Sequence, residues 1–156
     1  MDNLISYKFG ALSTLENLPG ASVRKGLELA ASMPIGERVT AGLAYTYTDA
    51  RRPDGTRLAQ VARHDLSLSL DAEVTDRLSA GLTVHHMAGR VDNDPNTFAL
   101  GPMPDFTVLN AAFTYALTDR SEAYLKIENL ADERYQLING YAASRRAVYV
   151  GISAKF

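Results

Sequence analysis

Apolar and other residues alternate repeatedly along this chain, in segments separated by polar or turn-forming stretches. In the final segment Val148, Val150, Ile152, Ala154 and Phe156 fall on one face, and every residue between them falls on the other. Strict alternation of this kind predicts β-strands with one apolar face, because successive side chains of a strand point to opposite sides. We expect eight strands, at about residues 4–9, 22–33, 39–49, 65–74, 78–84, 107–117, 122–128 and 148–156.

The length of the strands and the character of their second face indicate a membrane. Most of the alternating segments run for about 10 residues, as tilted strands do when they cross a bilayer, whereas sandwich strands average about 5 or 6. The faces opposite the apolar ones carry many Gly, Ala, Ser and Thr residues and no second apolar layer. We therefore predict an all-β fold, an antiparallel up-and-down transmembrane β-barrel in one domain over 1–156, rather than a soluble sandwich.

The connections between the expected strands alternate between short and long. Tight turns are expected at 34–37, 75–77 and 118–120, and long loops at 10–21, 50–62, 91–105 and 131–144. Outer-membrane barrels have short periplasmic turns and long extracellular loops. This layout predicts Tyr45 and Tyr47 near the outer membrane interface, and Phe113, Tyr115 and Phe156 near the inner one.

Composition excludes several other classes. The net charge is -2 and the pI about 5.9, so nothing favours nucleic acid as a partner. There is no cysteine, and no apolar run approaches the ~20 residues of a membrane helix. Met1 to Leu4 do not read as the start of a secretory signal, so we expect that a leader was removed or that the chain is part of a longer protein.

The candidate chemistry is sparse. His85 and His86 are consecutive and must point to opposite faces of a strand, so we predict no metal site and no cofactor. Asp49, Asp65 and His85 could approach each other at the outer rim, as an outer-membrane protease or acyltransferase would need, but their spacing does not require contact, and we expect no enzyme. Asp92-Asn93-Asp94 lacks the glycine and distal glutamate of a calcium loop and is interpreted as a solvated turn.

A cluster of positive charge lies around the second long loop. Its members are Arg51, Arg52, Arg57 and Arg63. Guanidinium groups bind phosphates and other anions through paired hydrogen bonds. Contact with lipopolysaccharide phosphates, contact with an anionic ligand, and ordinary loop charge all stay open.

Several short motifs resemble those of one family. Glu128-Asn129-Leu130, followed by Asp132 and Tyr135, resembles the penultimate hairpin of TonB-dependent outer-membrane receptors, and Gly26-Leu27-Glu28 is similar to their recurrent Gly-x-Glu strand. Gly140-Tyr141, Arg145-Arg146 and Val148 to Gly151 resemble the cobalamin-transporter branch in particular. The end of the chain also resembles the signal by which outer-membrane barrels are recognised for insertion, with Tyr149, Gly151, Ala154 and Phe156 as its positions.

The resemblance implies the final eight strands of a 22-stranded barrel in the bacterial outer membrane, without the plug domain and the TonB box. The implied function is receptor-mediated uptake of a large scarce nutrient, cobalamin or a metal chelate such as a siderophore, which this chain does not perform alone. The implied partners are outer-membrane lipid and lipopolysaccharide, the barrel-assembly machinery, the nutrient and, in the parent protein, a plug and TonB. Loop residues expected to contact the nutrient are Arg52, Asn96, Phe98, Tyr135 and Tyr141.

A second interpretation is a stand-alone eight-stranded barrel with a structural or surface-interaction role. Eight strands suffice to close a barrel whose interior is filled by side chains. Because an open sheet leaves two unpaired edges, we expect the chain to close on itself, with the opening strand around Tyr7 against Val148 to Ser153.

Overall fold

The computed structural model describes residues 5–8, 14–17 and 19–155, and this part of the chain is built from strands, turns and loops. It contains no helix that is long and apolar enough to span a membrane. The long strands are β3 (Val23–Ile35), β4 (Val39–Arg51), β5 (His64–Thr75), β6 (Leu78–Ala88), β9 (Phe106–Thr118), β10 (Ser121–Glu128) and β13 (Ala147–Ala154). The short ones are β1 (Ile5–Lys8), β2 (Thr14–Asn17), β7 (Val91–Asn93), β8 (Leu100–Pro102), β11 (Gln136–Ile138) and β12 (Tyr141–Ala142).

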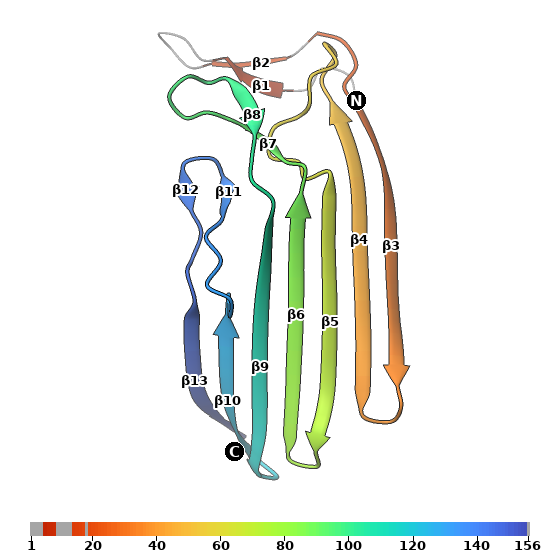
Figure 1. Cartoon of the computed structure of the whole chain (residues 1–156), viewed down its shortest axis with the longest axis vertical. Coiled ribbons are helices and arrows are strands. Elements are labelled where there is room, and N and C mark those ends of the chain that lie inside the picture. The colour runs from red at the N-terminus through yellow and green to blue at the C-terminus, as the bar shows by residue number, and fades with distance from the viewer. Residues whose placement is uncertain (1–4, 9–13, 18, 156) are drawn as a thin grey trace.

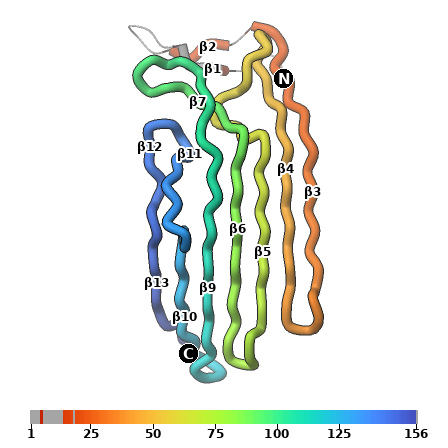
Figure 2. Tube along the Cα trace, in the orientation of Figure 1, coloured from red at the N-terminus to blue at the C-terminus, as the bar shows by residue number. Residues whose placement is uncertain are grey.

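The seven long strands form one antiparallel sheet with the order β13-β10-β9-β6-β5-β4-β3. Each long strand therefore pairs with the long strands before and after it in the chain, as in an up-and-down meander. Figure 1 shows the three short turns together at one end of the sheet and the loops with their small strands at the other. The trace in Figure 2 follows the same path.

The register places the predicted apolar faces on one side of the sheet. Ala31, Leu43, Leu68, Val84 and Leu109 are successive partners across five neighbouring strands. Farther along, Leu125 pairs with both Phe113 and Val150. The predicted period-2 pattern and the predicted antiparallel order are confirmed, and all seven predicted segments from 22–33 onward coincide with long strands, apart from their exact ends and the undescribed Phe156.

This sheet is a single layer with little core of its own. Many apolar side chains of this face are exposed, including Leu29, Leu43, Leu68, Val150 and Ile152, and Val84, Leu109 and Leu125 are half-buried. Among the described residues the buried apolar ones are Ala50, Met103, Phe106, Val108 and Ala111. A continuous exposed apolar face on long strands is what a surface in contact with lipid requires.

Two sequence predictions are corrected at the edges of the sheet. The opening strand pairs as β1 with β2, in a separate two-stranded sheet that lies at the loop end (Figure 1), and not with β13. The long sheet thus has seven strands instead of eight, and it is open, with β3 and β13 as its edges. The prediction of self-closure is wrong, because no strand among the described residues bridges those edges.

The turns and loops follow the predicted alternation, with added structure in the loops. At the turn end, Arg38 donates a hydrogen bond of 2.6 Å to Asp76, which joins two neighbouring turns. At the loop end, β7 pairs with β8 and β11 pairs with β12, so the third and fourth long loops are small hairpins that extend from the sheet. The sequence pattern did not predict these hairpins, since they are too short for a periodicity signal.

Candidate functional site

The loop end of the sheet is held together by a buried arginine. Arg90, between β6 and β7, is 4% exposed. Its Nη1 donates to the carbonyls of Gln136 at 2.8 Å and Leu137 at 3.3 Å, and its Nη2 donates to the carbonyl of Pro104 at 2.9 Å. The guanidinium also lies 4.7 Å from the centroid of the Phe106 ring. Burial lowers the pKa of Arg90 below its ordinary value, opposed by the charges of Asp105 and Asp92.

A buried carboxylate, that of Asp92, also joins these loops by hydrogen bonds. Asp92 is 3% exposed and accepts hydrogen bonds from the backbone N–H of Asn93 at 2.8 Å and of Asn139 at 2.9 Å. Gln60 Nε2 lies 3.4 Å from the same carboxylate, which brings in the second long loop. The sequence interpretation of Asp92 as part of a solvated turn is therefore wrong, because its carboxylate is buried. Asp94 does form such a turn, because its carboxylate accepts the N–H groups of Asn96 and Thr97.

Asn129, in the motif that begins at Glu128, is the centre of a hydrogen-bonded loop. Asn129 is 3% exposed and has a positive φ of 51°. Its Nδ2 donates to the carbonyls of Glu133 at 2.9 Å and Ser144 at 3.2 Å, and its Oδ1 accepts the N–H of Glu133 at 2.8 Å. Its own N–H donates to Asn110 Oδ1 at 2.9 Å. The Asn129 side chain thus closes the loop after β10, while its backbone N–H links that loop to β9.

Asp132 and Arg145 close the base of the same loop. Arg145 Nε donates to Asp132 Oδ1 at 2.8 Å, its Nη2 pairs with Oδ2, and the N–H of Arg146 reaches the same carboxylate at 3.1 Å. These hydrogen bonds, first the one from the Arg145 side chain, hold the pKa of Asp132 far below its ordinary value, and the pair raises the pKa of Arg145. Both groups lie in the loop and are partly exposed.

Beneath these loops, the inward face of the sheet carries a hollow of about 600 Å³. Polar side chains from four strands line it, among them His85, Asn110 and Lys126, together with the buried ring of Phe106. Tyr135 lies over Phe106 with ring centroids 4.4 Å apart. The hollow is therefore bounded by an aromatic pair toward the loops and by polar groups along the sheet.

The five predicted ligand residues are distributed over different loops. Tyr135 lines the hollow, whereas Tyr141 is 71% exposed at the start of β12 and Phe98 is 53% exposed at the tip between β7 and β8. Asn96 is exposed in the same tip, and Arg52 follows β4. The structure keeps these residues at the loop end without gathering them into one pocket.

The three histidines lie on the two faces of the sheet that the alternation predicted. His85 Nε2 lies 2.8 Å from Asp65 Oδ1 on the inward face, while His64 and His86 bond to Tyr45 and Thr107, at 2.8 and 2.9 Å, in the outward register. Asp49 is engaged elsewhere, by Arg51 at 3.0 Å. Within the described residues, no three His, Asp or Glu side chains gather as a metal site would need.

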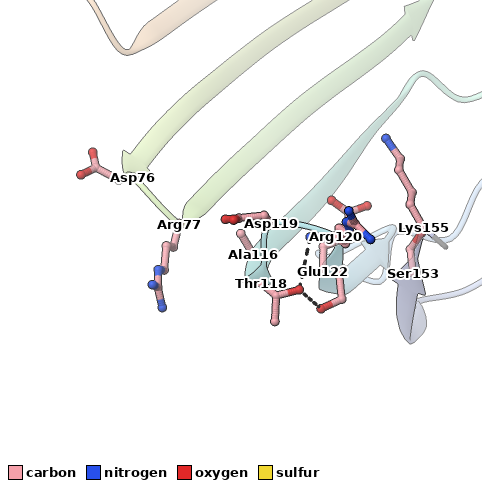
Figure 3. Close-up of a pocket in the computed structure, with 10 residues that line it drawn as sticks. Asp76, Arg77, Ala116, Thr118, Asp119, Arg120, Glu122, Ser153 and Lys155 are labelled. Atoms are coloured by element: carbon pink, nitrogen blue, oxygen red, sulfur yellow. Dashed lines mark hydrogen bonds between the residues drawn. The ribbon is translucent and has the colours of Figure 1, made fainter.

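The opposite end of the sheet carries a shallow hollow of about 420 Å³ between the turns. Figure 3 shows Arg77, Arg120, Lys155, Asp119 and Glu122 around it. Thr118 Oγ1 accepts the N–H of Arg120 at 3.2 Å and bonds Ser121 at 2.7 Å, which fixes the turn between β9 and β10. The charges of both signs are interspersed, and the hollow is open to solvent.

The predicted insertion-signal residues lie mostly along β13. Gly151 is the register partner of Tyr124, and a Cβ on Gly151 would overlap the Tyr124 ring. Tyr149 Oη lies 3.4 Å from Glu128 Oε2, and Ala154 ends the strand opposite Ser121. Phe156 lies outside the described residues. The glycine therefore has a packing reason of its own, because the tyrosine lies across it.

Sequence reasoning missed Arg90 and did not assign Asn129 a structural role. Arg90 stands in a polar stretch, and its hydrogen-bond partners follow it by 14, 46 and 47 positions. The available signal was Asn129 within the Glu-Asn-Leu motif, since asparagine is enriched where φ is positive.

Comparison with known proteins identifies the family. Residues 1–130 match the model of the family described as TonB dependent receptor-like, beta-barrel. The chain is an open piece of antiparallel barrel wall, and it belongs to this family of receptor β-barrels. It is 28% identical over 159 aligned residues to the vitamin B12 transporter BtuB of Vibrio cholerae, an alignment that covers 100% of this chain and 25% of that protein. It is also 28% identical to the iron-regulated outer membrane virulence protein of Vibrio cholerae, over 84% of this chain and 21% of the relative.

Solved structures show the same fold. The copper transporter OprC superposes with a TM-score of 0.80 at 18% identity, over 99% of this chain and 26% of that one. A ferric enterobactin receptor mutant of Pseudomonas aeruginosa superposes with a TM-score of 0.75 at 21% identity, over 99% of this chain and 28% of that one. The chain thus spans about a quarter of the length of the proteins it matches. The named relatives are transporters and receptors.

Proposed function

We infer that this chain is part of the transmembrane wall of a TonB-dependent receptor in the bacterial outer membrane, where it carries loops of the extracellular ligand vestibule. Residues 1–156 all belong to the barrel domain. The parent protein supplies a plug domain and the contact with TonB. In this role the chain binds and passes on a nutrient without chemical change. Its assembly uses the barrel-assembly machinery, with Tyr149, Gly151, Ala154 and Phe156 as the recognised end.

The observation that carries this proposal is the alignment with BtuB along the entire chain. The exposed apolar face supports a lipid environment on one side. The polar inward hollow and the tied loops support a ligand or plug on the other. The stand-alone eight-stranded barrel loses its support, because the long sheet has seven strands and open edges.

The nutrient that we propose is cobalamin, with a ferric siderophore as the second candidate. The relative that aligns along all of this chain is a vitamin B12 transporter, while another is iron-regulated and one similar structure is a ferric enterobactin receptor. Exposed Phe98 and Tyr141 offer aromatic faces to either ligand. Arg52 offers a positive charge, which favours an anionic chelate.

The test is ligand binding by the natural full-length protein that carries this sequence. Cyanocobalamin and a ferric tris-catecholate are titrated in parallel against the purified protein. We expect cyanocobalamin to bind and Tyr141→Ala to weaken that binding about tenfold, as loss of an interfacial aromatic anchor does. Tyr115→Leu, which keeps an apolar side chain at the opposite end of the sheet, leaves the affinity unchanged.

The possible results separate the candidates. Binding of the catecholate alone assigns the protein to siderophore uptake. Binding of neither ligand, by protein that is folded and inserted, contradicts both assignments.

A further inference from the structure

A compact cluster of cations lies on the outward side of the loop end. Arg51 and Asp49 follow Leu43, Tyr45 and Tyr47 in the outward register of β4. Arg51 Nε donates to Asp49 Oδ2 at 3.0 Å, and Arg63 Nη2 lies 3.9 Å from Asp49 Oδ1. We name Arg51, Arg57 and Arg63 the arginine cluster.

The third member is brought in by the backbone. Arg57 forms an isolated antiparallel bridge with Arg51, which places the two side chains on the same face. Its Nη2 bonds to the carbonyl of Gly89, and the Cβ of Arg63 lies beside that glycine. Lys25 is the register partner of Asp49 and adds a fourth positive charge.

The acids nearby offset this charge only in part. Asp49 is shared by two arginines, Asp54 accepts both the N–H and the hydroxyl of Thr56, and Asp105 accepts the N–H of Gly89. Burial first, and then the like charges of Arg63 and Arg51, lower the pKa of Arg57, against the opposing effect of Asp49. The cluster therefore carries an excess of positive charge that an anion would relieve.

The depth of the arginine cluster in the membrane indicates which anion it meets. Tyr45, Tyr47 and His64 form an aromatic group on the same face, with Tyr45 Oη 2.8 Å from His64 and the Tyr47 ring 5.4 Å from the His64 ring. Asp49 lies two residues beyond Tyr47 along β4, which is about 7 Å at roughly 3.3 Å per strand residue. Aromatic side chains mark the membrane interface of barrels, so the cluster lies at the level of the outer headgroups.

We propose that the arginine cluster binds the phosphate groups of lipopolysaccharide in the outer leaflet. Guanidinium groups in pairs suit phosphate oxygens, and part of each side chain is exposed at this site. The site lies outside the barrel and is separate from the nutrient vestibule. It rests on the proposed function only in that the apolar face meets the outer membrane.

The test uses the natural full-length protein, purified in detergent and titrated with bisphosphorylated lipid A. Dephosphorylated lipid A and phosphatidylglycerol serve as comparison probes. We expect the double variant Arg51→Gln/Arg63→Gln to weaken lipid A binding at least about tenfold, since each charged hydrogen bond is worth roughly that factor. Arg77→Gln/Arg120→Gln, which removes the same charge at the turn end, leaves binding unchanged.

A charge-preserving variant and the comparison lipids complete the test. The variant Arg51→Lys/Arg63→Lys keeps the charge. It should bind lipid A more weakly than the natural protein and more tightly than the glutamine variant. Together with a thermal unfolding scan, it controls for folding. Unchanged lipid A binding by the glutamine variant, or equal binding of dephosphorylated lipid A, overturns the proposal. Equally tight phosphatidylglycerol binding replaces lipopolysaccharide with any anionic lipid. Cyanocobalamin binding is measured on the same variants, so that failure of the nutrient assignment is seen separately.

Discussion

Two single residues, Asn129 and Arg90, hold the loop end together through hydrogen bonds to backbone groups of distant segments. The Asn129 side chain binds backbone groups of Glu133 and Ser144, and the residue adopts a left-handed backbone conformation that asparagine tolerates. The Glu-Asn-Leu motif is therefore explained by hydrogen bonding, independently of ligand contact.

Replacing Asn129 tests this explanation. Asn129→Ala should lower the free energy of unfolding by about 0.5 to 1.5 kcal/mol for each hydrogen bond lost. Asn129→Asp, which keeps the acceptor for the Glu133 N–H, should cost less. Unfolding in urea of the protein refolded in detergent provides the measurement, with exposed Asn96→Ala as the control. An Asn129→Ala variant as stable as the Asn96→Ala variant would contradict the structural role.

Gly151 offers a second residue-scale test, because it lies under the Tyr124 ring. Gly151→Ala should destabilise the natural protein, and the loss should shrink in a Tyr124→Ala background by about 0.5 to 3 kcal/mol, the usual coupling of contacting residues. A double-mutant cycle of urea unfolding gives this coupling. If the two substitutions are simply additive while insertion in cells still fails, Gly151 acts only as part of the insertion signal.

At the scale of the strands, period-2 alternation decides which face meets lipid. Leu68 lies in the outward row, between Leu43 and Val84, while the neighbouring Ser67 lies inward beside His85. Moving the register by one residue would exchange these faces completely. The strand is therefore specified by burial in lipid as much as by its hydrogen bonds.

Arginine substitutions on adjacent positions measure that asymmetry. Leu68→Arg or Leu43→Arg should destabilise the membrane-inserted protein by about 2 to 4 kcal/mol near the bilayer midplane. Ser67→Arg should be milder, because its face is polar. Folding into lipid vesicles gives the comparison, and equal losses on the two faces would reject the orientation.

At the scale of the whole molecule, the open sheet leaves β3 and β13 with unpaired backbone groups along one side each. Lipid offers no hydrogen bonds, so these edges require further strands when the chain is in a membrane. A chain that spans about a quarter of its relatives' length agrees with such a requirement.

The edges can be tested by crosslinking the 156-residue chain refolded in detergent. Cysteines at Ser6 and Val150 should form no disulfide within one chain, because β1 pairs with β2. Cysteines at Leu125 and Val150, which are register partners, provide the positive control. Mass spectrometry after oxidation distinguishes links within and between chains. A Ser6–Val150 link within one chain, formed as readily as the control, would restore self-closure.

Local pattern was enough to predict the seven long strands, their faces and the turns between them, because each depends on neighbours two to four positions away. It determined the family too, through local motifs around Asn129 and Gly151. Which loops meet depends on the three-dimensional fold, since the hydrogen bond from Asn139 to Asp92 joins residues 47 positions apart. The fold also decided that the opening strand leaves the long sheet and that Arg57 joins Arg51 and Arg63 beside Asp49. Those outcomes depend on pairing between distant segments, for which several partners satisfy the same local pattern.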